Sequence, residues 1–303
     1  MVRLVGAVAL RSLALSAIAA LPFAARAHEV TAAPAASPWT SWNLAPWLLA
    51  LLLLSAAGYG VGLWRLWRNA GSGRGIAKHQ ALSFALGWVS LVAALVSPLD
   101  PLGSQLFSAH MVQHELLMVV AAPLLVLGRP LATWTWALAP AQRRVVGRWV
   151  QSRGWSALWK VLTDPLVAWA LHAIALWAWH IPALFNGALE HEGLHILQHF
   201  SFFGTALFFW WAVLGHDPRG RYAPGHSAAY LFTTMMHTAA LGALLCLAPT
   251  PWYAPYIAQA AALGFDPVED QQLGGLVMWV PAALAYVVAA LWVIGKVLTR
   301  VRA

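Results

Sequence analysis

The chain has 303 residues, of which 61% are hydrophobic and only 9% are charged. Soluble globular proteins carry about 25% charged residues, so this composition excludes a cytosolic enzyme. Nineteen tryptophans favour a membrane protein, because indole prefers the boundary between lipid and water. The formal net charge of +8 does not by itself indicate a nucleic-acid partner. The single cysteine, Cys246, excludes disulfide frameworks and thiolate metal clusters.

The amino-terminal residues 1–27 predict a signal peptide. They carry a base near the start, continue as a run of Val, Ala and Leu, and end in Ala-Arg-Ala at 25–27, which fits a cleavage site. Arg11 interrupts the apolar run, so an uncleaved anchor is the alternative. After cleavage the mature chain would begin at His28, and residues 28–44 would form a lead-in outside the membrane.

Residues 45–300 are expected to form one all-α membrane domain. Seven apolar stretches come close to the ~20 residues that a helix needs to cross the hydrocarbon core. They predict a polytopic integral membrane protein with a bundle of seven transmembrane helices. The expected helices lie at about 45–64, 79–97, 106–127, 164–182, 193–214, 227–248 and 273–295.

The basic residues predict the orientation of these helices. With the mature amino terminus outside, every Lys and Arg beyond the signal peptide falls on an inside loop or on the carboxyl tail. This distribution obeys the positive-inside rule and places the carboxyl terminus in the cytoplasm. The bases would then face anionic membrane lipid, and nucleic acid is not an expected partner. Residues 139–163 mix Arg with Val and Trp, which predicts an amphipathic helix on the inner face.

Eight of the twelve histidines fall in the middle or outer half of the third to sixth expected helices. Histidines inside a membrane are unfavourable unless they face the bundle interior, where they mark functional sites. Residues four apart share one helix face, and a helix rises 1.5 Å per residue, so the spacing predicts two stacked metal sites. The shallow site would contain His110, His180 and His195. The deeper site would contain His114, His199 and His237.

Other side chains near these layers are candidate ligands. Imidazole and thioether without thiolate suit copper, above all Cu(I), although imidazole alone also binds zinc, iron and nickel. Glu115 follows His114 inside the third expected helix and is a candidate for orienting a liganding histidine from behind. The alternative for each methionine is ordinary packing. The possible additional ligands are His172, His191, Met118, Met235 and Met236.

Three other functions are compatible with these histidines. Residues 191–195 read His-Glu-Gly-Leu-His, the H-E-x-x-H motif in which two histidines hold zinc and Glu192 activates water. Gly193 weakens the helix that a metalloprotease motif requires. Imidazoles that face each other could also hold haem from both sides. Stacked sites could instead form the path of a copper permease.

Several segments carry a resemblance to a known family. One begins with His-Met-Val-Gln-His at 110–114 and continues through Leu, Met and Pro residues to Pro130. Others follow at 179–185, 195–210, 236–256 and 270–281. In this order they resemble the CtaG-type cytochrome c oxidase assembly factors, a seven-span bacterial family associated with caa-type oxidases. The resemblance covers about residues 80–300.

The resemblance implies a non-enzymatic role in maturing a haem-copper oxidase in the bacterial inner membrane. It implies that copper is helped toward the CuB centre of the oxidase catalytic subunit, with a periplasmic copper donor as a further possible partner. A mature amino-terminal His28 could also chelate copper through its amine and imidazole.

Overall fold

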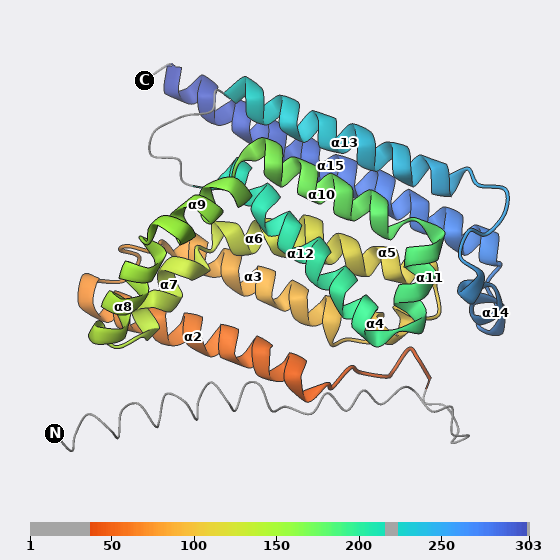
Figure 1. Cartoon of the computed structure of the whole chain (residues 1–303), viewed down its shortest axis with the longest axis horizontal. Helices are drawn as coiled ribbons and strands as arrows, with labels where there is room; N and C mark the ends of the chain where they lie inside the picture. The colour runs from red at the N-terminus through yellow and green to blue at the C-terminus, as the bar shows by residue number, and fades with distance from the viewer. Residues whose placement is uncertain (1–36, 216–223, 302–303) are drawn as a thin grey trace. The chain divides into compact units, whose positions relative to one another are not determined.

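The computed structural model describes residues 37–215 and 224–301, which belong to one compact unit (Figure 1). The described residues form helices joined by turns and contain no strand, so the all-α prediction is confirmed for this part of the chain. The predicted signal peptide and His28 lie outside the described residues.

The helices are α2 (Pro46–Ala70), α3 (Lys78–Leu95), α4 (Leu99–Gly103), α5 (Phe107–Glu115), the π-helix η1 (Leu116–Ala121), α6 (Ala122–Leu127), α7 (Pro130–Ala137), α8 (Pro140–Val150), α9 (Arg153–Leu162), α10 (Pro165–Trp179), α11 (Pro182–Glu190), α12 (Glu192–Leu214), α13 (Pro224–Cys246), α14 (Ala254–Ala262) and α15 (Pro267–Val301).

Five helical segments of the described chain are long and apolar enough to cross a membrane. They lie in α2, in α5–η1–α6 (Phe107–Leu127), in α12, in α13 (Ser227–Cys246) and in α15 (Pro267–Gly295). The pair α9 and α10 gives a sixth candidate, although it is bent by 63°. The chain is therefore a multi-pass helical membrane protein by composition and helix length, and a seventh span at α3 stays a prediction.

The helix α3 is nearly long enough to cross a membrane, but its first residues are polar. It contains 18 residues and starts with Lys78, His79 and Gln80. In Figure 1 it runs alongside α2 and α6, and its buried residues Phe84 and Leu91 join a core cluster with both neighbours.

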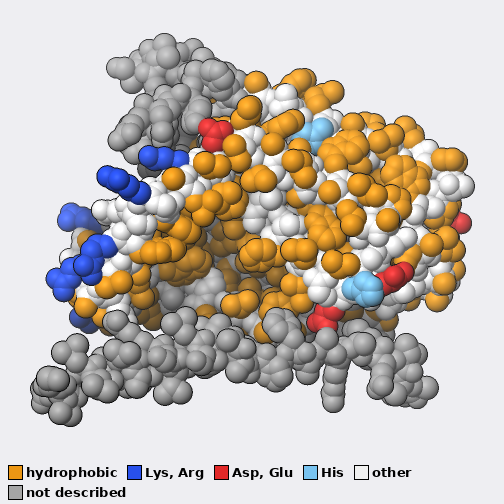
Figure 2. All heavy atoms as spheres, in the orientation of Figure 1, with side chains coloured by type: hydrophobic (Ala, Val, Ile, Leu, Met, Phe, Trp, Pro, Cys, Tyr) orange, Lys and Arg blue, Asp and Glu red, His pale blue; other side chains and the backbone are white. Residues whose placement is uncertain are grey.

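The surface of the helices matches a lipid environment. Large apolar side chains are exposed along several helices, including Leu54, Phe200 and Leu166, which are at least 69% exposed. Figure 2 shows hydrophobic side chains over most of the visible face, with Lys and Arg gathered at the end where α8 lies. Soluble monomers rarely expose apolar patches this large, so lipid is the natural solvent for this face.

The single amphipathic helix predicted at 139–163 is two helices in the structure. The helix α8 ends at Val150, and Ser152 occupies the N-cap position of α9 with an extended backbone. Both helices place bases beside apolar residues, so the amphipathic character is retained. A second change of direction follows, because α9 and α10 are bent by 63° relative to each other.

Small residues let the backbones of neighbouring helices approach. A Cβ atom at Gly62 of α2 would overlap the carbonyl oxygen of Thr133 in α7, and one at Gly58 would lie 3.2 Å from the Trp134 ring. The same principle operates between α13 and α15, where a Cβ at Gly242 would lie 2.8 Å from the Gly275 oxygen. Inside lipid no hydrophobic effect drives helices together, so membrane helices associate through the close packing that small residues allow.

The contact at Gly62 gives the first prediction. Gly62→Ala should separate α2 from α7 and reduce the unfolding free energy by about 1–3 kcal/mol, which thermal unfolding in detergent would detect. Gly60→Ala is the matched control, because a Cβ there meets nothing within 4 Å. Equal unfolding temperatures for the two variants would contradict the close packing of α2 and α7.

Candidate metal centre

Four histidines from two helices form one cluster. His110 and His114 lie on α5, and His195 and His199 lie on α12. The ring centroids are 4.2 Å apart within each helix, 5.5 Å apart between His110 and His195, and 5.2 Å apart between His114 and His199. One ligand nitrogen from each of His110, His195 and His199 lies within 4.8 Å of the other two. Three imidazoles at this spacing could hold a metal ion, with the His114 ring beside them.

The two layers predicted from helix rise are joined in the structure. Four residues advance a helix by about 6 Å, but the centroids of the paired rings lie only 4.2 Å apart on each helix. His110 of the shallow layer also lies 5.8 Å from His199 of the deeper layer. The observed cluster therefore combines members of both predicted sites.

Of the two remaining predicted ligands, His180 lies beside the cluster and His237 lies apart from it. The His180 ring lies at the edge of the cluster, about 6 Å from Phe185 and from Phe202. The His237 ring contacts Trp169 of α10 at 5.6 Å, and the nearby His172 has its Nδ1 3.1 Å from Thr205 Oγ1. His172 and His237 also interact electrostatically with each other, so they form a pair apart from the four-histidine cluster. Helix rise predicts depth, but it does not predict which neighbour a helix face meets.

The other candidate ligands have separate environments. Met118 is buried in an apolar core cluster, Met235 packs against that cluster, and Met236 is 53% exposed. His191 is exposed at the N-cap of α12 with extended backbone angles, φ −127° and ψ 112°. It therefore lies outside the helix that the H-E-x-x-H motif would require. The Glu115 carboxylate interacts electrostatically with Tyr286 of α15.

Hydrogen bonds fix how His110 faces the cluster. Its Nδ1 lies 3.1 Å from the carbonyl oxygen of Gly103 and 3.1 Å from the hydroxyl of Tyr256, which itself donates to that carbonyl at 2.7 Å. A proton on Nδ1 donates to the Gly103 oxygen and leaves the Nε2 lone pair directed to the cluster. This is the usual arrangement behind a metal-binding histidine.

Most of the remaining ring nitrogens are buried without partners. Among the described residues, the Nε2 atoms of His110, His180, His195 and His199, and both nitrogens of His114, lack a hydrogen bond of normal geometry, although the buried Gln198 side chain interacts with His110. Buried polar atoms are normally satisfied, so a group of unpartnered atoms at one place requires an explanation. A bound metal ion satisfies several imidazole lone pairs at once.

Two aspartates that the sequence analysis did not single out position α5. Asp270 of α15 is 3% exposed and accepts hydrogen bonds from the backbone N–H groups of Phe107 and Ser108, at 2.7 and 3.2 Å. It therefore caps the first turn of a helix 162 residues earlier in the chain. The available signal was the segment 270–281, which begins at Asp270 and carries part of the family resemblance, but the sequence does not indicate the partner of this acid.

Asp100 of α4 forms a second polar link. Its carboxylate accepts hydrogen bonds from the amides of Gln113, at 2.8 Å, and Asn43, at 2.9 Å. Burial raises the pKa of the Asp100 carboxyl, while Gln113, His195 and Asn43 oppose this shift. Asp100 thus places a negative charge near His195 at the end of the cluster.

A π-helix begins directly after the second histidine of α5. The segment η1 starts at Leu116, and the regular α-helix resumes at Ala122. Single π-turns inside α-helices occur frequently at functional sites. Its position next to His114 and Glu115 is consistent with a site at this level of the bundle.

The segment that contains the cluster matches a known family. Residues 57–300 match the cytochrome c oxidase caa3 assembly factor family, Caa3_CtaG. The chain belongs to this family. The match confirms the resemblance carried by residues 110–130 and the later segments, and all four clustered histidines fall within it.

Individual relatives are distant and longer than this chain. Uncharacterized proteins of Mycobacterium bovis and Mycobacterium tuberculosis are 27% identical over 259 residues, and one of Mycobacterium leprae is 25% identical over 255 residues. These alignments cover 79% to 82% of this chain but only 37% to 38% of the relatives, so the chain spans less than two fifths of their length. No solved structure shows significant similarity to the chain.

The cap from α15 gives the second prediction. Asp270→Ala leaves the buried N–H of Phe107 and the part-buried N–H and hydroxyl of Ser108 without this acceptor, and should reduce the unfolding free energy by about 3 kcal/mol. Hydrogen exchange in α5 should also increase, because the first turn loses its anchor. Glu269→Ala is the control, since Glu269 is an exposed acid in the same turn of α15 and its side chain forms no hydrogen bond with the described residues. Unchanged exchange in α5 would contradict the positioning role of Asp270.

Proposed function

We propose that this chain is a non-enzymatic membrane assembly factor that binds copper and aids its delivery to the CuB centre of a haem-copper oxidase catalytic subunit. His110, His195 and His199 are the proposed ligands, with His114 and His180 beside them. The observation that carries the proposal is the convergence of three ligand nitrogens within 4.8 Å at a place where their Nε2 atoms lack a hydrogen bond of normal geometry. Membership of an oxidase assembly family supports the oxidase as recipient.

The chemistry of the cluster favours Cu(I) over a divalent ion. Neutral imidazoles without an adjacent thiolate leave the charge of the ion largely uncompensated, and burying a charge in an apolar interior is costly. A monovalent ion therefore suits the cluster better than Zn²⁺. Imidazole is also a normal ligand of copper. Two acids of the described chain, Asp100 and Glu192, have an electrostatic link to the cluster, and both interact with His195.

The position of the cluster suits ligand exchange. His195 lies one turn from the start of α12, close to the end of the bundle where α4, α11 and α14 lie in Figure 1. Three imidazoles leave an open coordination position on a four-coordinate ion. An incoming histidine of the oxidase can occupy that position before the bonds to this chain break. Copper is thus bound as cargo and leaves without a change in the protein's covalent structure.

The alternatives fit the geometry less well. A haem held from both sides needs a slot between its imidazoles, but Phe185 lies 5.2 Å from the His110 ring and Phe202 lies 4.6 Å from the His114 ring. The metalloprotease motif is divided between the exposed N-cap His191 and the clustered His195. The described histidines inside the bundle form the cluster and the separate pair His172 and His237, whereas a permease needs a series of stations that reaches both faces of the membrane.

Copper stoichiometry gives the third prediction. Purified protein loaded anaerobically with Cu(I) and then dialysed should retain about one copper per chain, and His110→Ala/His199→Ala should retain almost none. His191→Ala should bind as much as the wild type, because His191 is exposed outside the cluster. Cells that carry only the double variant should lose assembled oxidase. Wild-type stoichiometry in the double variant would remove the proposed site, whereas copper loss with normal oxidase assembly would remove only the delivery role.

The link between Tyr256 and His110 gives the fourth prediction. Tyr256→Phe removes one of the two groups that orient Nδ1 and should weaken Cu(I) binding about tenfold, the lower end of the effects seen when partners of ligands are removed. A competition titration with a chromogenic Cu(I) chelator measures this change. Tyr253→Phe is the control, because its hydroxyl donates to the backbone oxygen of His180 rather than to a ring. Equal affinities for the two variants would exclude an orienting role for Tyr256.

A further inference from the structure

The helices α8 and α9 form an element with little packing against the rest of the chain. They connect α7 to α10, and neither contains a buried residue. Five of their apolar side chains are between 44% and 56% exposed: Val145, Trp149, Val150, Leu158 and Val161. The axis of α9 is bent by 63° from that of α10, so α9 does not continue the span. Amphipathic helices that leave the direction of a span and expose apolar residues are typical of the membrane interface.

The charge of this element is entirely positive. Residues 140–162 contain four arginines and one lysine but no acid. Arg143 is used within the fold, because its Nε donates to the Thr135 oxygen at 3.2 Å and its guanidinium lies 4.0 Å above the Trp136 ring. Arg144 and Arg148 are exposed on successive turns of α8 and form no hydrogen bond or ion pair with the described residues. Their charges are therefore available to a partner of opposite charge.

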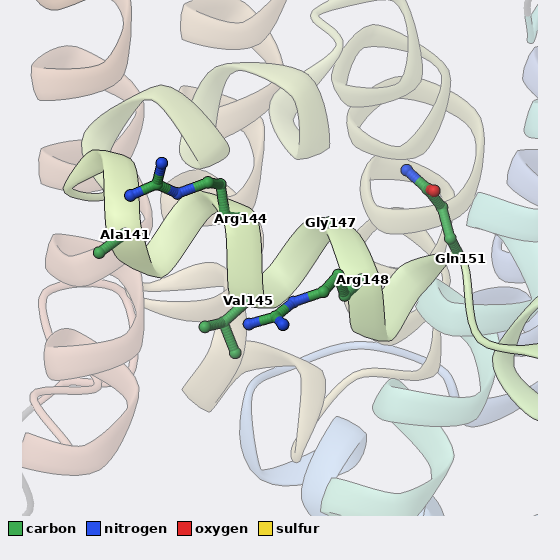
Figure 3. A pocket seen from close by; sticks show the side chains of 6 residues that line it. All are labelled: Ala141, Arg144, Val145, Gly147, Arg148 and Gln151. Carbon is green, nitrogen blue, oxygen red and sulfur yellow. The ribbon is translucent and has the colours of Figure 1, made fainter.

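A hollow lies along the same face of α8. It is lined by Ala141, Arg144, Val145, Gly147, Arg148 and Gln151 (Figure 3). The Gly147 position is open, since a Cβ there would meet nothing within 4 Å. In Figure 3 the guanidinium of Arg148 lies beside Val145, and Arg144 rises from the preceding turn. The hollow thus combines guanidinium donors with an apolar side chain.

We propose that α8 binds the headgroup phosphate of an anionic phospholipid through Arg144 and Arg148, with Val145 and Trp149 against the acyl chains. Guanidinium groups are well suited to phosphate because they offer several fixed donors. Free phosphate would leave the apolar side chains of α8 uncovered, whereas a lipid covers both types of group. The spans next to α8 already face lipid through exposed apolar residues, so the lipid surface is continuous with this element. This proposal does not depend on copper binding.

Native mass spectrometry of the full-length protein tests the proposal. The purified protein is titrated with phosphatidylglycerol or phosphatidylcholine of identical acyl chains, and the affinity of the first bound lipid is compared. The wild type should prefer phosphatidylglycerol, and Arg144→Gln/Arg148→Gln should weaken this binding about 30-fold. That factor corresponds to about 2 kcal/mol, or about 1 kcal/mol for each base near anionic lipid. Affinity for phosphatidylcholine should not change.

Two controls separate this site from general attraction by positive charge. Arg74→Gln/Lys78→Gln removes the same charge from one exposed residue of the α2–α3 connection and from the exposed first residue of α3, and should retain the preference for phosphatidylglycerol. Inorganic phosphate at millimolar concentration should not displace the lipid. Equal losses in the two double variants, or displacement by inorganic phosphate, would overturn the proposal. It would also be overturned if the α8 variant kept its lipid preference and instead failed to co-purify with the oxidase, because the occupant would then be a protein.

Discussion

Buried imidazole nitrogens need hydrogen-bond or metal partners, and the account of the histidine cluster depends on this requirement. His110 and His114 are each 1% exposed, and together with His195 and His199 they leave several ring nitrogens without a hydrogen bond among the described residues. One unpartnered buried atom is a modest cost, but a group of them in an apolar bundle is a large one. A metal ion removes this cost for all of its ligands together. Copper binding is therefore the proposal that best explains why a bundle of this composition keeps these histidines.

The polar groups around the cluster form a scaffold at one end of the bundle. Asp270 caps α5 from α15, Gln113 joins α5 to Asp100 of α4, and Tyr256 of α14 reaches the Gly103 carbonyl beside His110. Asp100 and Tyr256 lie on the short helices α4 and α14, and Asp270 lies in the first turn of α15. The cluster is thus held by connecting elements, while small residues such as Gly62 and Gly242 set the distances between the helices themselves. Such a scaffold holds α5 in a fixed position against its neighbours.

The sequence predicted the helical class, the apolar segments and the histidine faces, because these depend on composition and on the helical repeat. It did not predict that the two histidine layers would merge, because the positions of the rings depend on packing. The contact between His237 and Trp169 could not be predicted from the sequence either, because the order of helices along the chain does not determine which helices are neighbours. The cap of α5 by Asp270 joins residues more than 160 positions apart, and local sequence patterns do not predict contacts between such distant residues. The π-helix after Glu115 similarly replaces a turn that the hydrophobic pattern predicted to be regular.

Copper K-edge X-ray absorption of the Cu(I)-loaded wild-type protein tests the central claim most directly. The account predicts a first shell of three or more nitrogen atoms, with the outer scattering that imidazole rings produce. A first shell that contains sulfur, from Cys246 or a methionine, or one with fewer than two imidazoles, would contradict a copper site built by His110, His195 and His199.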